Sequence, residues 1–437
     1  MFSRHSLPIL WALAGAAMAQ AESAPEINQA DTAWLMISTA LVVLMTPGLA
    51  FFYGGLVRSK NALNTMMMSF ASLGAVGVAW ALFGYSLAFS PGGKFLGGTD
   101  FFFLHNVGLE AKGTIPHLLF MGFQATFAII TAALMSGAVV ERKRFGPYLL
   151  FILAWSLLVY APVAHWVWGG GWLANAGALD FAGGTVVHVT AGITALVAAL
   201  VLGPRKEFRV QEIVPHNVPF VLLGTAMLWF GWFGFNAGSA LGANTTAALA
   251  MVNTMLAPMA TLCVWMIADI VRNKKVTAVG AAVAIVVGLV GITPAAGYVS
   301  PMNAMVLGAL VALPCYFAVH QWRHRVRLDD SLDVFASHGL GGITGAILTG
   351  FLAEEAHGGV NGLLFGNPKQ VLVQAGAVLA VALYTAIVSY ALLKILDLIV
   401  PVRSQDEAEG LGLDIAEHGE SAYAGDDRQG IAVAYAT

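Results

Sequence analysis

Apolar stretches of about 20 residues recur along nearly the whole chain, and short polar loops separate them. A helical stretch of that length crosses a hydrocarbon core roughly 30 Å thick. The crossings must be helical, because backbone groups left unpaired in lipid are too costly. Only 10% of the 437 residues are charged, against roughly 25% in an ordinary soluble domain. The sequence therefore predicts an all-α integral membrane protein that has lipid as its main solvent.

We predict eleven membrane-spanning helices. Lys and Arg concentrate in cytoplasmic loops, and 16 of them lie after the odd-numbered helices or in the C-terminal tail. The opposite loops hold only Lys94, Lys112 and Lys369. This asymmetry predicts an N-terminus outside and a C-terminus inside. The approximate helix ranges are 32–57, 65–90, 116–140, 146–168, 184–203, 219–241, 246–270, 277–298, 302–321, 334–354 and 370–399.

The two ends of the chain differ in character from the middle. Residues 1–19 read as a signal peptide, with Arg4 in a basic region, an apolar core at 7–17 and a small-residue cleavage site at 17–19. An uncleaved anchor is the alternative. Residues 20–400 form the predicted membrane domain, and residues 401–437 form an acidic, polar cytoplasmic tail. The net charge of -3 argues against a nucleic-acid partner.

The fifth and tenth predicted helices share the pattern H-x-x-x-G-I-T, at 188–194 and at 338–344. The first and sixth helices share an aromatic and glycine-rich run, at 51–55 and 232–238. Because five helices precede the second copy, that copy would be inverted in the membrane. An inverted repeat of five plus five helices is a recurrent transporter plan, with the substrate path at the repeat interface near the midplane. The eleventh helix falls outside the repeat.

Ionisable side chains inside a membrane are costly and mark functional sites. His188 and His338 occupy equivalent repeat positions, so a pseudo-two-fold axis would bring them together. Two adjacent imidazoles can share a proton and present nitrogens to a small neutral molecule. Axial ligation of a haem is an alternative for such a pair. The other histidines are interpreted as structural or solvated: His165 and His320 as structural, and His105, His117, His216, His324, His357 and His418 as solvated.

Asp180 lies between a loop rich in tryptophan and glycine and the fifth helix. A carboxylate there attracts a cation or holds the loop by accepting backbone N–H groups. Eight residues, about 12 Å of helix, separate it from His188, so we expect no direct contact with the histidine pair. Several aromatic residues and a serine lie near the outer ends of helices. Either an interfacial aromatic belt or a cation–π site accounts for this group, which comprises Phe123, Phe127, Trp168, Phe235 and Ser239.

Five segments, taken in order, resemble motifs of the ammonium transporter family, which includes the bacterial ammonium permeases and the Rhesus-type proteins. The resemblance is closest to the bacterial permeases and runs from about residue 31 into the tail. The segments are 47–56 with 60–61, 164–171, 179–188, 231–239 and 333–339.

This resemblance implies a role for each candidate residue. It places an outer recruitment site on Phe127, Trp168 and Ser239, and a stacked gate on Phe127 and Phe235. His188 and His338 match the family's twin-histidine pair. Asp180 matches an aspartate needed for conduction, and Trp232 matches a pore-lining tryptophan.

The resemblance also implies how the protein assembles and what it contacts. It indicates a homotrimer in a bacterial inner membrane, surrounded by lipid, with one ammonium-conducting pore per subunit, no enzymatic activity and no cofactor. Residues 409–423 resemble the family's regulatory tail, with Gly412 as one extra residue. A trimeric PII-type nitrogen signalling protein is the partner that such a tail implies.

The expected mechanism follows from the cost of moving a bare cation through an apolar pore. Ammonium is captured at the outer aromatic site, gives up its proton, and crosses as the neutral base beside the histidines. Potassium resembles ammonium in size but has no proton to lose, so it would be excluded. Whether the proton follows the base stays open, and a membrane-embedded ammonium sensor without flux is the rival function.

Overall fold

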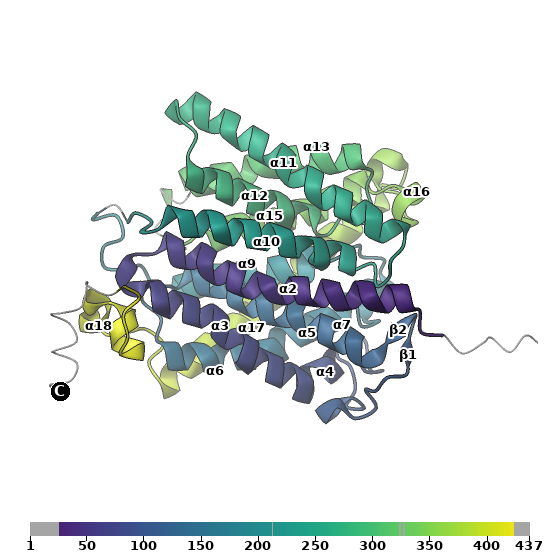
Figure 1. Ribbon diagram of the computed structural model, residues 1–437, viewed down its shortest axis with the longest axis horizontal. Helices are drawn as coiled ribbons and strands as arrows, with labels where there is room; N and C mark the ends of the chain where they lie inside the picture. Colours follow the sequence, from purple (N-terminus) through teal and green to yellow (C-terminus); the bar gives the residue numbers. More distant parts are fainter. Residues whose placement is uncertain (1–25, 212, 323–324, 327, 424–437) are drawn as a thin grey trace, which may run out of the picture.

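The protein is a bundle of helices that run roughly side by side along its long axis (Figure 1). The computed structural model describes residues 26–211, 213–322, 325–326 and 328–423. The predicted signal peptide at 1–19 lies outside these residues. Among them, the only strands are β1 (Ala111–Lys112) and β2 (Ile115–Pro116), which form a small antiparallel hairpin.

Each predicted crossing has a helical counterpart, and several of them combine α-helical with π-helical or 3-10 turns. In chain order these are α2 (Gln29–Leu56); α3 (Ala62–Ala79), η2 (Trp80–Gly84) and α4 (Tyr85–Phe89); α5 (His117–Leu134) and η4 (Met135–Ala138); α6 (Phe145–Trp155), η5 (Ser156–Tyr160) and α7 (Ala161–Val167); η6 (Gly184–Val189) and α9 (Thr190–Leu202); α10 (Val218–Gly238); α11 (Thr245–Asn273); α12 (Ala278–Ile292); α13 (Pro301–Phe317) and η7 (Ala318–Trp322); η8 (Phe335–Gly339) and α15 (Leu340–Leu352); and α17 (Lys369–Ile399).

Ten of these helices are long and apolar enough to cross a membrane. The eighth prediction, 277–298, corresponds to α12, which has 15 residues and is therefore only about 22 Å long. The protein is thus an all-α, multi-pass membrane protein, as predicted. The count of eleven crossings and the orientation stay predictions.

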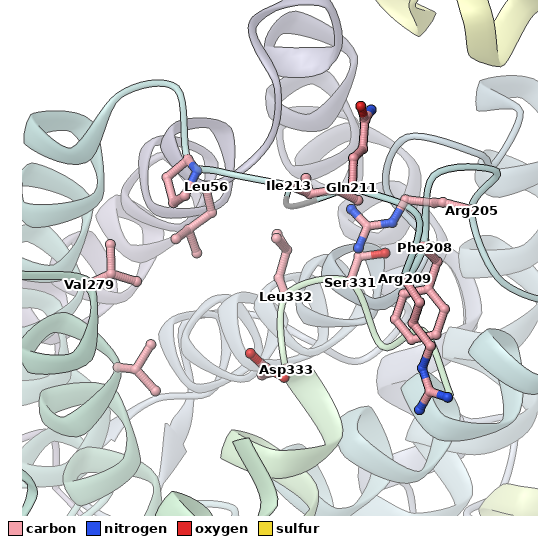
Figure 2. Close-up of a pocket in the computed structure, with 12 residues that line it drawn as sticks. Leu56, Arg205, Phe208, Arg209, Gln211, Ile213, Val279, Ser331, Leu332 and Asp333 are labelled. Carbon is pink, nitrogen blue, oxygen red and sulfur yellow. The ribbon is translucent and has the colours of Figure 1, made fainter. Parts of the chain in front are cut away.

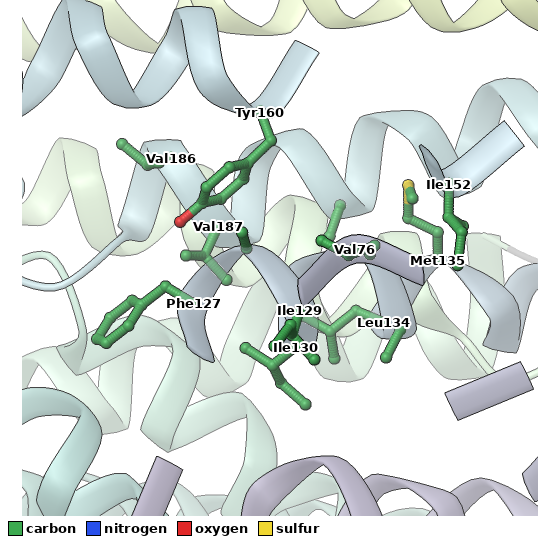
Figure 3. Packing of buried hydrophobic residues seen from close by; sticks show 14 of the residues in the cluster. Val76, Phe127, Ile129, Ile130, Leu134, Met135, Ile152, Tyr160, Val186 and Val187 are labelled. Carbon is green, nitrogen blue, oxygen red and sulfur yellow. The ribbon is translucent and has the colours of Figure 1, made fainter. Parts of the chain in front are cut away.

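α3, α5 and α6 lie on the opposite side of the bundle from α11, α12 and α13, whereas α17 lies on the side of α3, α5 and α6 (Figure 1). α2 and α10, which begin the two halves of the chain, lie side by side along the middle of the bundle (Figure 1). The core of the first half is mainly apolar, and α3, α5, α6 and the η5 and η6 turns contribute to it. Figure 3 shows side chains that these elements contribute to the core, among them Val76, Ile130, Ile152, Tyr160 and Val187. A core of this kind fixes η6, and hence His188, against α5.

A buried ionic cluster joins the two halves of the chain at one end of the bundle. This end carries Arg58, Arg142 and Arg205, and we call it the basic end. Arg205 donates to Glu141 at 2.7 Å and to Asp329 at 2.8 Å. Burial opposes ionisation of Glu141, but Arg205 and Arg58 hold the pKa of its carboxyl below its usual value. The sequence predicts that the basic residues here lie in cytoplasmic loops. The side chains of Arg142, Lys143 and Arg205 are all buried, and Arg142 and Arg205 each contact Asp329 of the second half.

The described part of the tail packs against the same end. Asp414 accepts hydrogen bonds from the backbone N–H groups of Leu63 and Asn64 at the start of α3, and Glu417 accepts from Phe145 at the start of α6. The additional Gly412 has φ +112° and touches the backbone of Lys60, where a side chain would not fit. The extra residue is therefore accommodated by a backbone conformation that suits glycine.

Two histidines predicted to be solvated take part in this packing instead. The Nε2 atom of His418 lies 3.0 Å from the side-chain oxygen of Asn64, and Nε2 of His216 lies 2.8 Å from the Tyr423 hydroxyl. The prediction was wrong because it treated the tail as an isolated segment.

Candidate functional site

His188 and His338 meet at the centre of the bundle. Their Nδ1 atoms are 3.2 Å apart and their rings 5.2 Å apart. Both side chains are almost completely buried, at 1% and 3% exposure. The two residues are 150 positions apart in the chain, so the repeat brings them together as the pseudo-two-fold arrangement requires.

The contact between the two rings determines which hydrogen-bonding groups the pair presents to the cavity. A hydrogen bond between two Nδ1 atoms requires a proton on one Nδ1 and a bare nitrogen on the other. When both rings are neutral, the donor ring has a bare Nε2 and the acceptor ring an Nε2–H. The Nε2 atom of His188 has no hydrogen-bond partner in the described structure. The pair can therefore present one acceptor and one donor to a small polar molecule.

The shared motif has a reciprocal packing role. Each histidine lies in a π-helical turn, η6 or η8, and each is followed four residues later by glycine. A Cβ atom on Gly192 would collide with the backbone of Gly339, and one on Gly342 would lie 2.9 Å from the Cβ of His188. Each glycine thus lets the opposite histidine segment approach, which explains the H-x-x-x-G pattern in both copies.

A narrow apolar cavity surrounds the pair. Trp232 lies alongside His188 with ring centroids 5.5 Å apart, and its indole N–H donates to Thr293 at 2.9 Å. The indole is thereby held in one orientation along the cavity. The other lining residues are Met45, Leu49, Phe52, Ile130, Leu134, Val187, Leu228, Phe235 and Val286.

Two stacked phenylalanines close the cavity at the end that the sequence predicts to lie outside. The rings of Phe127 and Phe235 are 4.1 Å apart and inclined by 25°, and both are 1% exposed. Trp168 stands perpendicular to Phe127 at 6.1 Å, and the Ser239 hydroxyl donates to the Phe235 carbonyl at 2.8 Å. Trp168 and Ser239 are partly exposed. The predicted outer residues therefore do converge, whereas Phe123 is fully buried behind Phe127.

Asp180 does not line the cavity, and its role is structural. Its carboxylate accepts hydrogen bonds from the backbone N–H groups of Gly183, Gly184, Thr185 and Val186, and from the Thr185 hydroxyl. The four N–H groups belong to the segment that begins η6, where no helical carbonyl is available to them. Asp180 therefore anchors the turn that carries His188 and, as expected, does not touch the histidine pair.

Asp330 is a counterpart that the sequence analysis missed. It lies eight residues before His338, as Asp180 lies eight residues before His188. Its carboxylate accepts from the backbone N–H of Phe335 at 2.7 Å, at the start of η8. The matching spacing was visible in the sequence and extends the repeat beyond the histidine motif.

The geometry excludes haem ligation by the pair, because two rings in direct contact leave no space for a metal and a flat macrocycle between them. Nor does the described structure contain a group of three or more His, Cys, Asp or Glu side chains suited to a metal ion. His165 is structural, as predicted, with ring nitrogens 2.9 and 2.7 Å from the carbonyls of Ala88 and Gly93.

A second cavity, of about 550 Å³, opens at the basic end. Figure 2 shows Arg205, Gln211, Ser331 and Asp333 among the side chains around it. Asp333 lies five residues before His338, so this cavity adjoins the segment that leads into η8.

Comparisons with known proteins agree with this architecture. The model of the Ammonium Transporter Family matches residues 33–423. An ammonium transporter of Bacillus subtilis is 46% identical, over 91% of this chain and 99% of its own length. The crystal structure of Candida albicans Mep2 superimposes with a TM-score of 0.84 at 38% identity, covering 92% of both chains. A structure described as a sensor Amt protein reaches a TM-score of 0.84 at 28% identity, over 89% of this chain and 98% of its own.

The relatives that match over nearly their whole length are named as transport proteins rather than enzymes, in keeping with the sequence-based expectation. The match spans both repeats, the eleventh helix and the described part of the tail. This chain belongs to the ammonium transporter family.

Proposed function

We propose that this protein conducts ammonium across a membrane by separating the ion from its proton at the outer gate and passing ammonia along the histidine pair. The observation that carries the proposal is a continuous series of rings from the partly exposed Trp168, through Phe127 and Phe235, to His188. The name shared by the relatives, ammonium transporter, supports the substrate.

Capture takes place at the outer end of this series. Trp168 and Phe127 stand at 89° to each other, so a small cation beside this pair can lie over the negatively polarised face of a ring. The Ser239 hydroxyl uses its proton on the Phe235 carbonyl, which leaves its oxygen free to accept from an ammonium N–H. Ring faces and one hydroxyl replace part of the hydration that the ion loses.

The gate and the cavity select the neutral base. A bare cation in an apolar cavity is strongly disfavoured, and the lining beyond Phe235 is apolar apart from the histidines and the indole of Trp232. Ammonia, in contrast, both donates and accepts hydrogen bonds, and so matches the single donor and single acceptor of a neutral histidine pair. Potassium cannot become neutral, which is the basis of the proposed selectivity.

The outer site is tested by Trp168→Ala and Ser239→Ala. A lost cation–π contact is worth roughly 0.5 to 2 kcal/mol, so the ammonium concentration at half-maximal uptake should rise by up to about thirtyfold. The maximal rate should change little, because the cavity is intact. Uptake by proteoliposomes over a range of ammonium concentrations measures both quantities. Trp168→Phe, which keeps a ring, is the matched control, and an unchanged concentration dependence in both alanine variants would refute the site.

A sensor is the second candidate, because a protein described as a sensor Amt protein has the same fold. A sensor without flux would bind ammonium at the same aromatic residues. Measurable uptake by the purified protein separates the two functions.

We also propose that the protein is a homotrimer in a bacterial inner membrane, and that a PII-type signalling protein docks at the basic end. The cavity there, with Arg209 and Gln211 on its wall, offers space for an inserted loop. The exposed Lys206, Lys274 and Lys275 offer charge. The tail packs beside Lys206, whose Nζ lies 3.1 Å from Asp406.

Capture of the detergent-solubilised trimer by its cognate PII protein tests this docking. We expect binding that depends on nucleotide and 2-oxoglutarate, and weaker binding after deletion of the residues beyond Ser404. Size-exclusion chromatography checks that the shortened protein is still a trimer. Absence of binding under every effector condition would defeat the partner, whereas full binding after deletion would remove only the tail from the interface.

A further inference from the structure

The outer end of α5 is held by three polar side chains that no part of the proposed mechanism uses. His117, the first residue of α5, was predicted to be solvated but is only 6% exposed. Its Nδ1 lies 2.9 Å from a carboxylate oxygen of Glu110, and its Nε2 lies 2.6 Å from the Tyr85 hydroxyl. Both ring nitrogens are therefore paired, on one side with the outer loop and on the other with α4.

The chemistry of the partners fixes the direction of these hydrogen bonds. Backbone N–H groups, including that of Gly108, together with the His117 ring hold the pKa of the Glu110 carboxyl below its usual value. Glu110 is thus an acceptor near neutral pH, and the proton must lie on Nδ1 of His117. In a neutral ring Nε2 is then bare and accepts from the Tyr85 hydroxyl. The three groups form a single directed chain with every member satisfied.

We call these three hydrogen-bonded residues the Glu110–His117–Tyr85 clasp. Aromatic rings and a further hydrogen bond surround the clasp. The Tyr85 ring lies against Phe101 and Phe120, at 5.6 and 6.3 Å. The Lys112 ammonium lies 5.1 Å above the Phe120 ring. The backbone N–H of His117 also donates to the Glu110 carbonyl at 2.9 Å. The clasp therefore ties α4, the loop before β1 and the start of α5 together.

The clasp lies on the same helix as the gate. Phe127 follows His117 by ten residues, about 15 Å along α5. Between them, the indole N–H of Trp80 donates to the Met121 carbonyl at 3.3 Å, so α5 is also held by the second crossing one helical turn in. A small tilt of α5 at its outer end would shear the stack in which Phe127 and Phe235 lie 4.1 Å apart.

We propose that Glu110, His117 and Tyr85 are positioning residues for transport, which hold the outer half of α5 so that Phe127 faces both Trp168 and Phe235. This inference rests on the proposed roles of the outer site and the gate. It differs from a purely local role in the loop, which would affect the stability of the protein but not the concentration dependence of uptake.

The test compares Glu110→Ala and Tyr85→Phe with Glu110→Gln. The amide oxygen of glutamine still accepts from Nδ1–H, whereas alanine and phenylalanine each leave a buried ring nitrogen unpaired. Glu355→Ala removes another exposed glutamate, whose carboxylate accepts a hydrogen bond from Asn361, and is the matched control. Two quantities are measured for each protein: ammonium uptake by proteoliposomes, and hydrogen–deuterium exchange of the amides in 117–127.

We expect Glu110→Ala and Tyr85→Phe to raise the half-saturating ammonium concentration about threefold to tenfold, the size of a weakened cation–π contact, with little change in maximal rate. Exchange across 117–127 should become faster in the same two variants. Glu110→Gln and Glu355→Ala should stay within about twofold of the unmodified protein, as expected for substitutions that break no buried contact.

Two results would overturn the inference. One is a wild-type half-saturating concentration in Glu110→Ala and Tyr85→Phe, whatever their stability. The other is unchanged exchange across 117–127 in both variants. If the proposed function is wrong, the unmodified protein takes up no ammonium. In that case the exchange rates of 117–127 alone test whether the clasp holds α5.

Discussion

Replacing His188 or His338 by phenylalanine is expected to lower the maximal rate of ammonium uptake about tenfold or more. The passing base loses a hydrogen-bond partner in a buried, apolar cavity, and an unmade hydrogen bond there costs about 1–3 kcal/mol. Proteoliposome uptake measures the rate. Potassium uptake by the same vesicles measures whether the altered cavity still excludes a permanent cation.

Comparing the stability of the two single variants with that of the double variant tests the hydrogen bond between the two Nδ1 atoms. Each single substitution leaves one Nδ1 buried without its partner at 3.2 Å, so each should be less stable than the unmodified protein by about 1–3 kcal/mol. The double variant leaves no unpaired nitrogen and should recover most of that loss, while transport stays impaired. Normal ammonium rates with intact potassium exclusion in both single variants would show that the pore is elsewhere.

Asp180→Ala is expected to reduce transport more than about a hundredfold and to lower the stability of the folded protein. The substitution removes the acceptor of four backbone N–H groups at the start of η6, and each buried donor left unpaired costs about 1–3 kcal/mol. The turn that carries His188 would then lose its anchor. Uptake by proteoliposomes and the thermal unfolding midpoint in detergent are the two measurements.

Asp330→Ala is the matched comparison for this prediction. Asp330 lies at the equivalent repeat position and accepts from the backbone N–H of Phe335, so its loss should act in the same direction on His338. Asp180→Asn keeps one carbonyl oxygen but turns an N–H toward other donors, and should fall between the unmodified protein and Asp180→Ala. Near-normal uptake by Asp180→Ala would contradict the anchoring role.

Hydropathy and motif spacing predicted most of the architecture. The apolar stretches correspond to the observed helices because a lipid-spanning segment is specified by its own composition. The shared H-x-x-x-G-I-T motif correctly placed His188 against His338, because the repeat alone defines that contact. The rings of Phe127, Trp168 and Phe235 converge as the family resemblance implied, but composition alone did not distinguish that arrangement from an aromatic belt.

What the sequence could not predict depends on contacts between distant segments. The π-helical turns at both histidines leave no mark in hydrophobic periodicity. His117 was predicted to be solvated, and Arg205 was counted only among the basic residues of a cytoplasmic loop, because their partners, Tyr85 and Asp329, lie 32 and 124 residues away. Side chains of this kind are buried only when paired, and the pairing is visible only in three dimensions.

The most direct test of the proposed transport mechanism compares ammonium with potassium in proteoliposomes that contain the unmodified protein. Equal inward gradients of the two ions are applied in turn, and uptake is followed with an ion-selective readout. We expect rapid ammonium uptake and no potassium uptake above that of empty vesicles, because only ammonium can enter the apolar cavity as a neutral base. Potassium uptake at a rate comparable to that of ammonium would contradict deprotonation as the basis of selectivity, and absence of ammonium uptake would contradict transport itself.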